Sequence, residues 1–218
     1  MIETPTVTPV NPTPIPTTFV YKSYLALGDS YTIGQSVDSV DRFPTQTATI
    51  LKQENINIVP LQYIATTGWT TTNLSTAITS VNPRGPFDVV SLLIGVNDQY
   101  QNRNINDYGG RFLQLLQTAI QLAGNKPNHV FVLSIPDYGV TPFGGSNSTI
   151  SQQIDAYNAI NKQVTQSIVG VNYIDITPAS RLAATDESLI AIDGLHPSGK
   201  QYKLWADLLA PKMMVVLR

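Results

Sequence analysis

The chain has 218 residues, of which 42% are hydrophobic and 13% are charged, and its formal net charge is −2. This composition supports a folded core and offers no basic surface for a phosphate backbone, so nucleic acid is not expected as a partner. No apolar run reaches the roughly 18 residues that cross a bilayer, and the absence of cysteine excludes disulfides, zinc–thiolate sites and thiol nucleophiles.

Residues 1–18 differ in composition from the rest of the chain. The stretch TPTVTPVNPTPIPTT, from Thr4 to Thr18, contains five prolines. Proline fixes φ and removes a backbone donor, so the stretch is predicted to be a semi-rigid, extended tether or else a disordered end. A tether of this kind would hold a domain of residues 19–218 away from a membrane or cell wall. We therefore expect an extracytoplasmic protein that is secreted, periplasmic or surface-tethered, with a cytoplasmic location left open.

From residue 19 onward, short apolar runs alternate with longer segments of helical periodicity. The expected strands span residues 24–27, 56–65, 87–95, 129–136 and 171–176, and the expected helices span residues 43–54, 71–81, 108–124, 150–168 and 198–209. Strands that are apolar on both faces and alternate with helices predict a mostly parallel sheet covered on both sides. The expected fold is therefore a three-layer α/β/α domain with a central five-stranded sheet.

Ligands bind outside the carboxyl ends of the strands in such sheets, so the loops after each strand are the places to look for chemistry. The first strand is followed by Gly28, Asp29 and Ser30. Ser30 is a candidate nucleophile, but a serine hydroxyl needs a base within hydrogen-bond reach. The alternative is that Asp29 or Ser30 caps a short helical turn.

A base and an acid follow the fifth strand in the segment DGLHP, which holds Asp193 and His196. The Asp193 carboxylate can bind one imidazole nitrogen of His196 and leave the other free as a base. A surface turn with a solvated histidine is the alternative, and Asp175 is the second candidate for the acid. The other histidine, His129, opens the fourth strand at the opposite end of the sheet and is interpreted as structural.

Two further loops offer hydrogen-bond donors. Asn97, in the segment GVND after the third strand, could donate its side-chain amide to a developing oxyanion, and Gly68, after the second strand, could expose its backbone N–H. The alternatives are an Asn–Asp turn, Asp98 as a helix cap, and an ordinary turn glycine.

Taken in order, these four segments resemble the SGNH (GDSL-type) hydrolase family of esterases and lipases. The matching blocks are Gly28-Asp29-Ser30, Gly68, Gly95-Val96-Asn97-Asp98 and Asp193-Gly194-Leu195-His196, and the resemblance extends over residues 21–210. The sequence departs from the family pattern at Tyr31, where leucine is usual, and around Gly68, where the usual serine–glycine pattern is replaced by Thr67-Gly68-Trp69.

The resemblance implies a flavodoxin-like fold and a serine esterase that needs no cofactor and no metal. Ser30, His196 and Asp193 would form the catalytic triad, and Ser30, Gly68 and Asn97 would form the oxyanion hole. The expected substrate is a small-molecule or glycan ester with a short acyl group. The alternatives are a lysophospholipase or thioesterase, or a non-catalytic glycan-binding module. Asp29, Tyr31, Trp69 and Tyr138 are candidates for the substrate pocket.

Overall fold

The computed structural model describes residues 18–218, so the predicted tether of residues 1–18 lies outside the described residues except for Thr18. The five strands are β1 (Val20–Gly28), β2 (Ile56–Ala65), β3 (Val89–Leu93), β4 (Val130–Leu133) and β5 (Asn172–Ile174). They form one sheet in the order β2-β1-β3-β4-β5, and every pair of neighbours is parallel. This is the sheet that the alternating pattern predicts.

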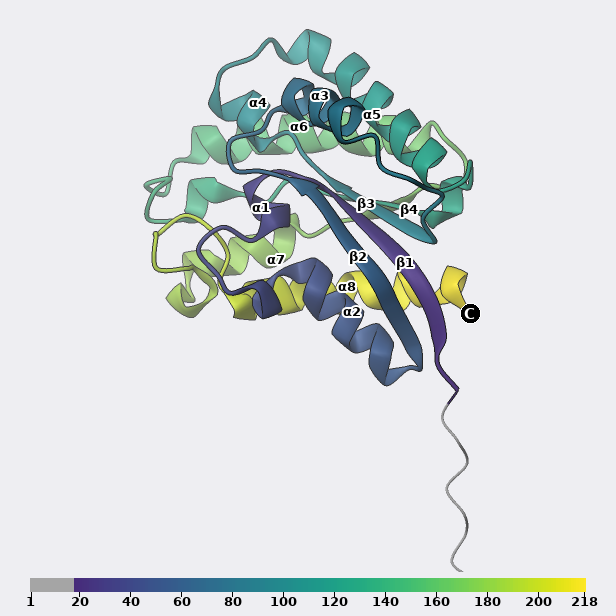
Figure 1. The fold of residues 1–218 in the computed structure, drawn as a ribbon. Helices are drawn as coiled ribbons and strands as arrows, with labels where there is room; N and C mark the ends of the chain where they lie inside the picture. The colour runs from purple at the N-terminus through teal and green to yellow at the C-terminus, as the bar shows by residue number, and fades with distance from the viewer. Residues whose placement is uncertain (1–17) are drawn as a thin grey trace, which may run out of the picture.

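Eight α-helices accompany the described strands. They are α1 (Ser30–Ile33), α2 (Phe43–Gln53), α3 (Thr71–Val81), α4 (Val96–Tyr100), α5 (Tyr108–Leu122), α6 (Ser148–Gln166), α7 (Thr177–Arg181) and α8 (Gly199–Leu217). Figure 1 shows α3, α5 and α6 above the sheet and α2 and α8 below it, which gives the three layers of the expected α/β/α fold.

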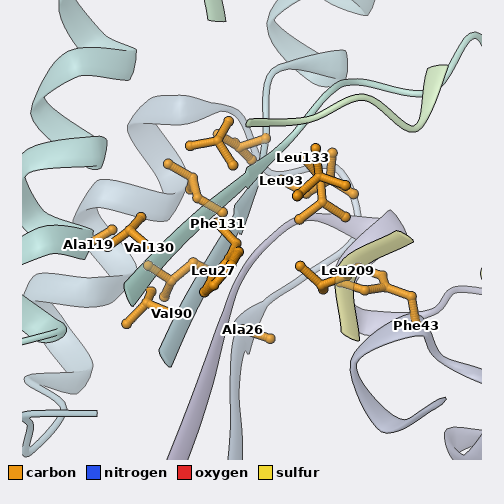
Figure 2. Packing of buried hydrophobic residues seen from close by; sticks show 14 of the residues in the cluster. Ala26, Leu27, Phe43, Val90, Leu93, Ala119, Val130, Phe131, Leu133 and Leu209 are labelled. Atoms are coloured by element: carbon orange, nitrogen blue, oxygen red, sulfur yellow. The ribbon is translucent and has the colours of Figure 1, made fainter. Parts of the chain in front are cut away.

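Apolar side chains fill both spaces between the sheet and its helices. Figure 2 shows Phe43 of α2 and Leu209 of α8 on one side of the strands, and Ala119 of α5 beside Val90 and Val130 on the other. The residues of β3 and β4 are buried throughout, as continuous apolar runs predict for central parallel strands.

Most element boundaries lie within three residues of the predicted ones, and two differ by more. The last helix was expected to end at Leu209, but α8 continues through Pro211 to Leu217. Proline removes one helical hydrogen bond, yet Met213 and Leu217 beyond it are buried, and their burial favours continuation of the helix. The first strand begins at Val20 rather than Tyr24, because its exposed first residues pair with Ile56, Asn57 and Ile58 of β2.

The strand order changes direction between β1 and β3, since β2 lies on one side of β1 and the later strands lie on the other. Crevices for ligands form at such a switch point, outside the carboxyl ends of the strands. The segments that follow β1 and β3 are those that contain Ser30 and Asn97.

Candidate active site

Ser30 is the first residue of α1, immediately after the carboxyl end of β1. Asp29 caps this helix by accepting a hydrogen bond from the Tyr31 backbone N–H at 3.0 Å. Gly28 is required at the end of the strand, because a Cβ there would lie 2.1 Å from Thr32 Oγ1 and 2.4 Å from the Leu93 carbonyl oxygen. The Gly-Asp-Ser segment therefore caps helix α1 and places Ser30 at its first position.

The Asp29 carboxyl group has an unusual environment. It is 1% exposed, and its second oxygen, Oδ2, has no hydrogen-bond partner among the described residues. Burial raises the pKa of Asp29 to about 8, and the nearby Asp98 adds to this effect while the Tyr31 N–H opposes it. Asp29 is therefore mostly protonated at neutral pH, so the charge beside Ser30 is small.

Asp193 and His196 are in direct contact. His196 Nδ1 lies 2.7 Å from Asp193 Oδ2, and the other carboxylate oxygen accepts the backbone N–H groups of Leu195 and His196 at 2.9 Å each. Burial acts to raise the pKa of Asp193, but hydrogen bonds from Ser36, His196 and Leu195 outweigh it and hold the pKa well below its ordinary value. Because a carboxylate oxygen only accepts hydrogen bonds, His196 Nδ1 is the donor in this contact, and Nε2 is the ring nitrogen that does not face Asp193.

A hydrogen bond joins the loop that carries Gly68 to the segment that carries Asn97. Asn97 Nδ2 donates to the Trp69 carbonyl oxygen at 3.0 Å, which uses one of its two N–H groups. Gly68 has a φ of +83°, a region that favours glycine, and a Cβ added there would meet nothing within 4 Å. Gly68 lines the pocket, and it has no side chain to cover its backbone there.

Asp98 secures this pair of loops. Its side chain is completely buried and accepts the Thr71 backbone N–H at 2.8 Å and the Thr71 hydroxyl at 2.7 Å, at the start of α3. Arg111 and Arg103 lie 3.4 and 3.7 Å from the same carboxylate. Asp98 does not cap its own helix, whose N-cap residue is Gly95; it joins the segments after β2 and β3.

One pocket of about 240 Å³ collects most of the predicted residues. Its polar lining consists of Ser30, Thr67, Gly68, Asn97 and His196, and its apolar lining consists of Tyr31, Val96, Tyr100, Tyr138, Phe143 and Leu195. The structure therefore brings the candidate nucleophile, base and oxyanion donors to one concave surface. Asp193, which is hydrogen-bonded to His196, does not line the pocket, and neither does Asp29, a predicted pocket residue that is buried.

An aromatic wall closes one side of this pocket. The rings of Tyr100, Tyr138 and Phe143 contact one another, with centroids 6.2 to 6.4 Å apart. Tyr100 and Phe143 are 55% and 53% exposed, so they lie at the mouth, whereas Tyr138 is buried. Trp69 does not line the pocket; its contribution is the carbonyl oxygen that holds Asn97.

Tyr31 lines the pocket beside the histidine. Its ring centroid lies 5.5 Å from that of His196 and 6.2 Å from that of Trp205. Its side chain is 3% exposed, and burial raises its pKa well above the ordinary value, so it stays neutral. The aromatic residue at this position therefore packs against the imidazole.

The structure also locates the residues that were set aside or left as alternatives. Asp175 is hydrogen-bonded to Ser134 at 3.1 Å and does not line the pocket. His129 binds the Asp88 carbonyl oxygen at the opposite end of the sheet. No group of three or more histidine, aspartate or glutamate side chains within residues 18–218 is placed to hold a metal ion.

Ser36 is a polar support of this site that sequence analysis missed. Its hydroxyl donates to Asp193 Oδ2 at 2.6 Å. A single serine in a polar turn carries no sequence signal for such a role, since its partner is 157 residues away.

The fold defines a class of protein with a parallel α/β/α sheet and a pocket at the carboxyl ends of its strands. The model of the GDSL-like Lipase/Acylhydrolase family matches residues 26–204, so the chain belongs to this family and is a carboxylic ester hydrolase. The sequence expectation of a GDSL-type hydrolase is thereby confirmed. No curated protein sequence shows significant similarity to the chain.

Solved structures show the same fold at low sequence identity. A Clostridium thermocellum family 3 carbohydrate esterase is 23% identical with a TM-score of 0.66, and the match covers 91% of this chain and 98% of that one. The lipase Lip_vut3 from a goat rumen metagenome is 20% identical with a TM-score of 0.64, covering 88% and 97%. The acetylxylan esterase Axe2 from Geobacillus stearothermophilus is 16% identical with a TM-score of 0.65, covering 91% and 96%.

No helix within residues 18–218 is both long and apolar enough to span a membrane.

Proposed function

We propose that the protein is a serine esterase that removes short acyl groups, such as acetyl, from small-molecule or glycan esters through an acyl-enzyme. The observation that carries the proposal is the pocket that His196 lines together with Ser30, Gly68 and Asn97, with His196 hydrogen-bonded to Asp193 outside the lining. These groups are a nucleophile, a base with its acid, and two oxyanion donors, as acyl transfer requires.

The proposed reaction has two halves. His196 takes the proton from the Ser30 hydroxyl as its oxygen attacks the ester carbonyl, and Asp193 stabilises the resulting imidazolium. The backbone N–H groups of Ser30 and Gly68 and the amide of Asn97 bind the oxyanion. His196 then protonates the leaving alcohol, and the same histidine activates the water that hydrolyses the acyl-enzyme.

The preference for short acyl groups is supported by the size and walls of the pocket. Its volume of about 240 Å³ is modest, and Tyr100, Tyr138 and Phe143 bound it on one side. The exposed rings of Tyr100 and Phe143 offer flat apolar surfaces to the alcohol part of the substrate. Two of the similar structures are a carbohydrate esterase and an acetylxylan esterase, which is consistent with an acetyl group on a sugar.

The nucleophile can be tested with a fluorophosphonate probe. Labelling is expected in the wild type and in the matched variant Ser146→Ala, whose serine is exposed and lies outside the pocket, and it should be lost in Ser30→Ala. Labelling that persists in Ser30→Ala would exclude Ser30 as the nucleophile.

Activity should also fall at acid pH as His196 becomes protonated, because only the neutral ring accepts a proton.

The acyl preference can be tested with p-nitrophenyl esters from acetyl to palmitoyl. Highest kcat/KM for acetyl is expected, and a maximum at long chains would favour a lysophospholipase or thioesterase instead. Absence of turnover for every ester, with an intact fold, would favour the non-catalytic binding module.

The proline- and threonine-rich residues 1–18 support an extracytoplasmic location, which cell fractionation with an antibody to the folded domain would test.

A further inference from the structure

The turn that follows α1 contacts two loops of the pocket through consecutive residues. Gln35 Oε1 accepts a hydrogen bond from the Thr67 hydroxyl at 2.6 Å, in the loop that carries Gly68. Ser36 donates its hydroxyl to Asp193 Oδ2 at 2.6 Å, in the loop that carries His196. One short turn, at the end of the helix that begins with the candidate nucleophile, thus joins the oxyanion side of the pocket to the acid–base side.

Ser36 holds this contact in an unfavourable backbone conformation. Its φ is +65°, in the left-handed region that costs a serine free energy relative to glycine. Such conformations persist where surrounding contacts hold them, and they concentrate at functional sites. A glycine would fit this φ without cost, but it would lack the hydroxyl that reaches Asp193.

The oxygen that Ser36 contacts is the one that binds the histidine. Asp193 Oδ2 accepts Ser36 Oγ at 2.6 Å and His196 Nδ1 at 2.7 Å, while Oδ1 is occupied by two backbone N–H groups. The Ser36 hydroxyl therefore fixes the rotation of the carboxylate and takes up part of the negative charge that faces the imidazole. Among the contacts that lower the pKa of Asp193, this hydrogen bond is the largest, although burial opposes it.

We propose that Ser36 is a positioning residue for the acid–base pair: its hydroxyl orients Asp193 Oδ2 toward His196 Nδ1 and moderates how strongly the carboxylate favours the imidazolium. This inference rests on the proposed function, because it assigns a role within the same site. Ser36 itself does not line the pocket, so it acts through Asp193 rather than on the substrate.

Other charges near the histidine do not replace this control. Besides the contacting carboxylate, four titratable side chains contact the ring or share a cavity with it: Tyr31 of α1, Tyr100 of α4, and Asp137 and Tyr138 of the segment after β4. Asp137 is paired with Arg181 at 2.9 Å. Burial raises the pKa of Tyr31 and of Tyr138, so these two side chains remain neutral. Asp193 is left as the carboxylate whose charge acts directly on the ring.

The test compares three variants with the wild type. Ser36→Gly removes the hydroxyl while keeping the positive φ, so the turn is retained. Ser36→Asn keeps a donor and tolerates the same φ. Ser146→Gly is the matched control, since Ser146 is also an exposed serine with a positive φ of +54° but lies outside the pocket.

For Ser36→Gly, we expect kcat for p-nitrophenyl acetate to fall about fivefold, the effect of one hydrogen bond, with KM nearly unchanged. The acid limb of the pH profile should move to higher pH, because a carboxylate without the serine donor stabilises the imidazolium more strongly. Ser36→Asn should recover at least part of both effects, and Ser146→Gly should behave as the wild type. A wild-type kcat and acid limb in Ser36→Gly would overturn the proposal, and so would a lower kcat with an unmoved acid limb, which would indicate a merely structural role.

An independent readout separates this proposal from the proposed function. The chain has only two histidines, so ring-proton NMR titration of wild type and Ser36→Gly, assigned with His196→Ala, follows His196 without any substrate. If no ester is hydrolysed but the His196 titration moves to higher pH in Ser36→Gly, the proposed function fails while the coupling of Ser36 to His196 stands. If the titration does not move, the coupling fails whatever the activity.

Discussion

Replacement of Asn97 by alanine tests the oxyanion hole most directly. The Asn97 amide has two N–H groups, of which one donates to the Trp69 carbonyl oxygen at 3.0 Å. The second has no partner among the described residues, and Asn97 lines the pocket beside Ser30. The variant Asn97→Ala therefore loses one transition-state donor and one contact between two loops, and these two losses have separate measurable effects.

The expected magnitudes differ for catalysis and for stability. Loss of one oxyanion donor costs about 3 to 4 kcal/mol of transition-state stabilisation, which lowers kcat by about 10²- to 10³-fold. The ground-state ester makes little use of this donor, so KM should change by less than about threefold. Loss of the hydrogen bond to Trp69 should lower the free energy of unfolding by about 1 kcal/mol, a decrease in Tm of roughly 3 °C for a domain of this size.

Steady-state hydrolysis of p-nitrophenyl acetate and thermal unfolding measure both effects. The matched control is Gln101→Ala, because Gln101 also contacts this loop, through the Gly68 carbonyl oxygen at 3.4 Å, but is exposed and does not line the pocket. It should keep nearly full activity. A kcat for Asn97→Ala within about threefold of the wild type, in a folded protein, would refute the role of Asn97 as an oxyanion donor.

Three further predictions concern the supports of the site. Burial raises the pKa of Asp29 to about 8, from about 3.9 in an unfolded chain, so between these pH values the folded state binds one more proton than the unfolded state. The free energy of unfolding should therefore fall by up to about 1.4 kcal/mol per pH unit as pH rises, and level off above the folded pKa. Urea unfolding from about pH 5 to 8 should lose this slope in Asp29→Asn, and an unchanged slope would contradict the assignment. Gly95→Ala should destabilise the fold by about 3 kcal/mol, since φ is +126° and a Cβ would lie 2.1 Å from the Tyr108 hydroxyl. Gly68→Ala should destabilise it by only about 1 kcal/mol, because the space around a Cβ there is open. Similar Tm values for the two variants would argue against this steric reasoning. Asp98→Asn should lower the free energy of unfolding by about 3 kcal/mol, because it replaces the completely buried carboxylate that binds the start of α3. A wild-type Tm in thermal unfolding would show that this contact is dispensable.

Local patterns in the sequence predicted several elements with their boundaries. Strand β2 and helix α3 have the expected bounds, Ile56–Ala65 and Thr71–Val81. The reason is local chemistry: the side chains of Thr70 and Asn73 form a capping box at the start of α3, and Asn82 ends it in a left-handed conformation. The two elements that differ most at their ends, β1 and α8, depend on partners distant in sequence, namely the β2 register and the burial of Met213 and Leu217.

By itself, the sequence determined the parallel α/β/α architecture, the family, and the set of residues that gather near one pocket. Alternating apolar strands and helices dictate a parallel sheet, and a parallel sheet places the segments after its strands at one edge. Ser30, Gly68, Asn97 and His196 could therefore be selected without coordinates, and all four line the pocket.

Only the tertiary structure decided how these residues are supported. Asp98, which local reasoning could treat as a cap of its own helix, instead binds Thr71 at the start of α3. Ser36, which carries no sequence signal, donates to a carboxylate 157 residues away. Hydrogen bonds of this kind depend on the relative placement of separate loops to within a fraction of an ångström, and that placement results from the packing of the whole sheet and its helices rather than from any local pattern.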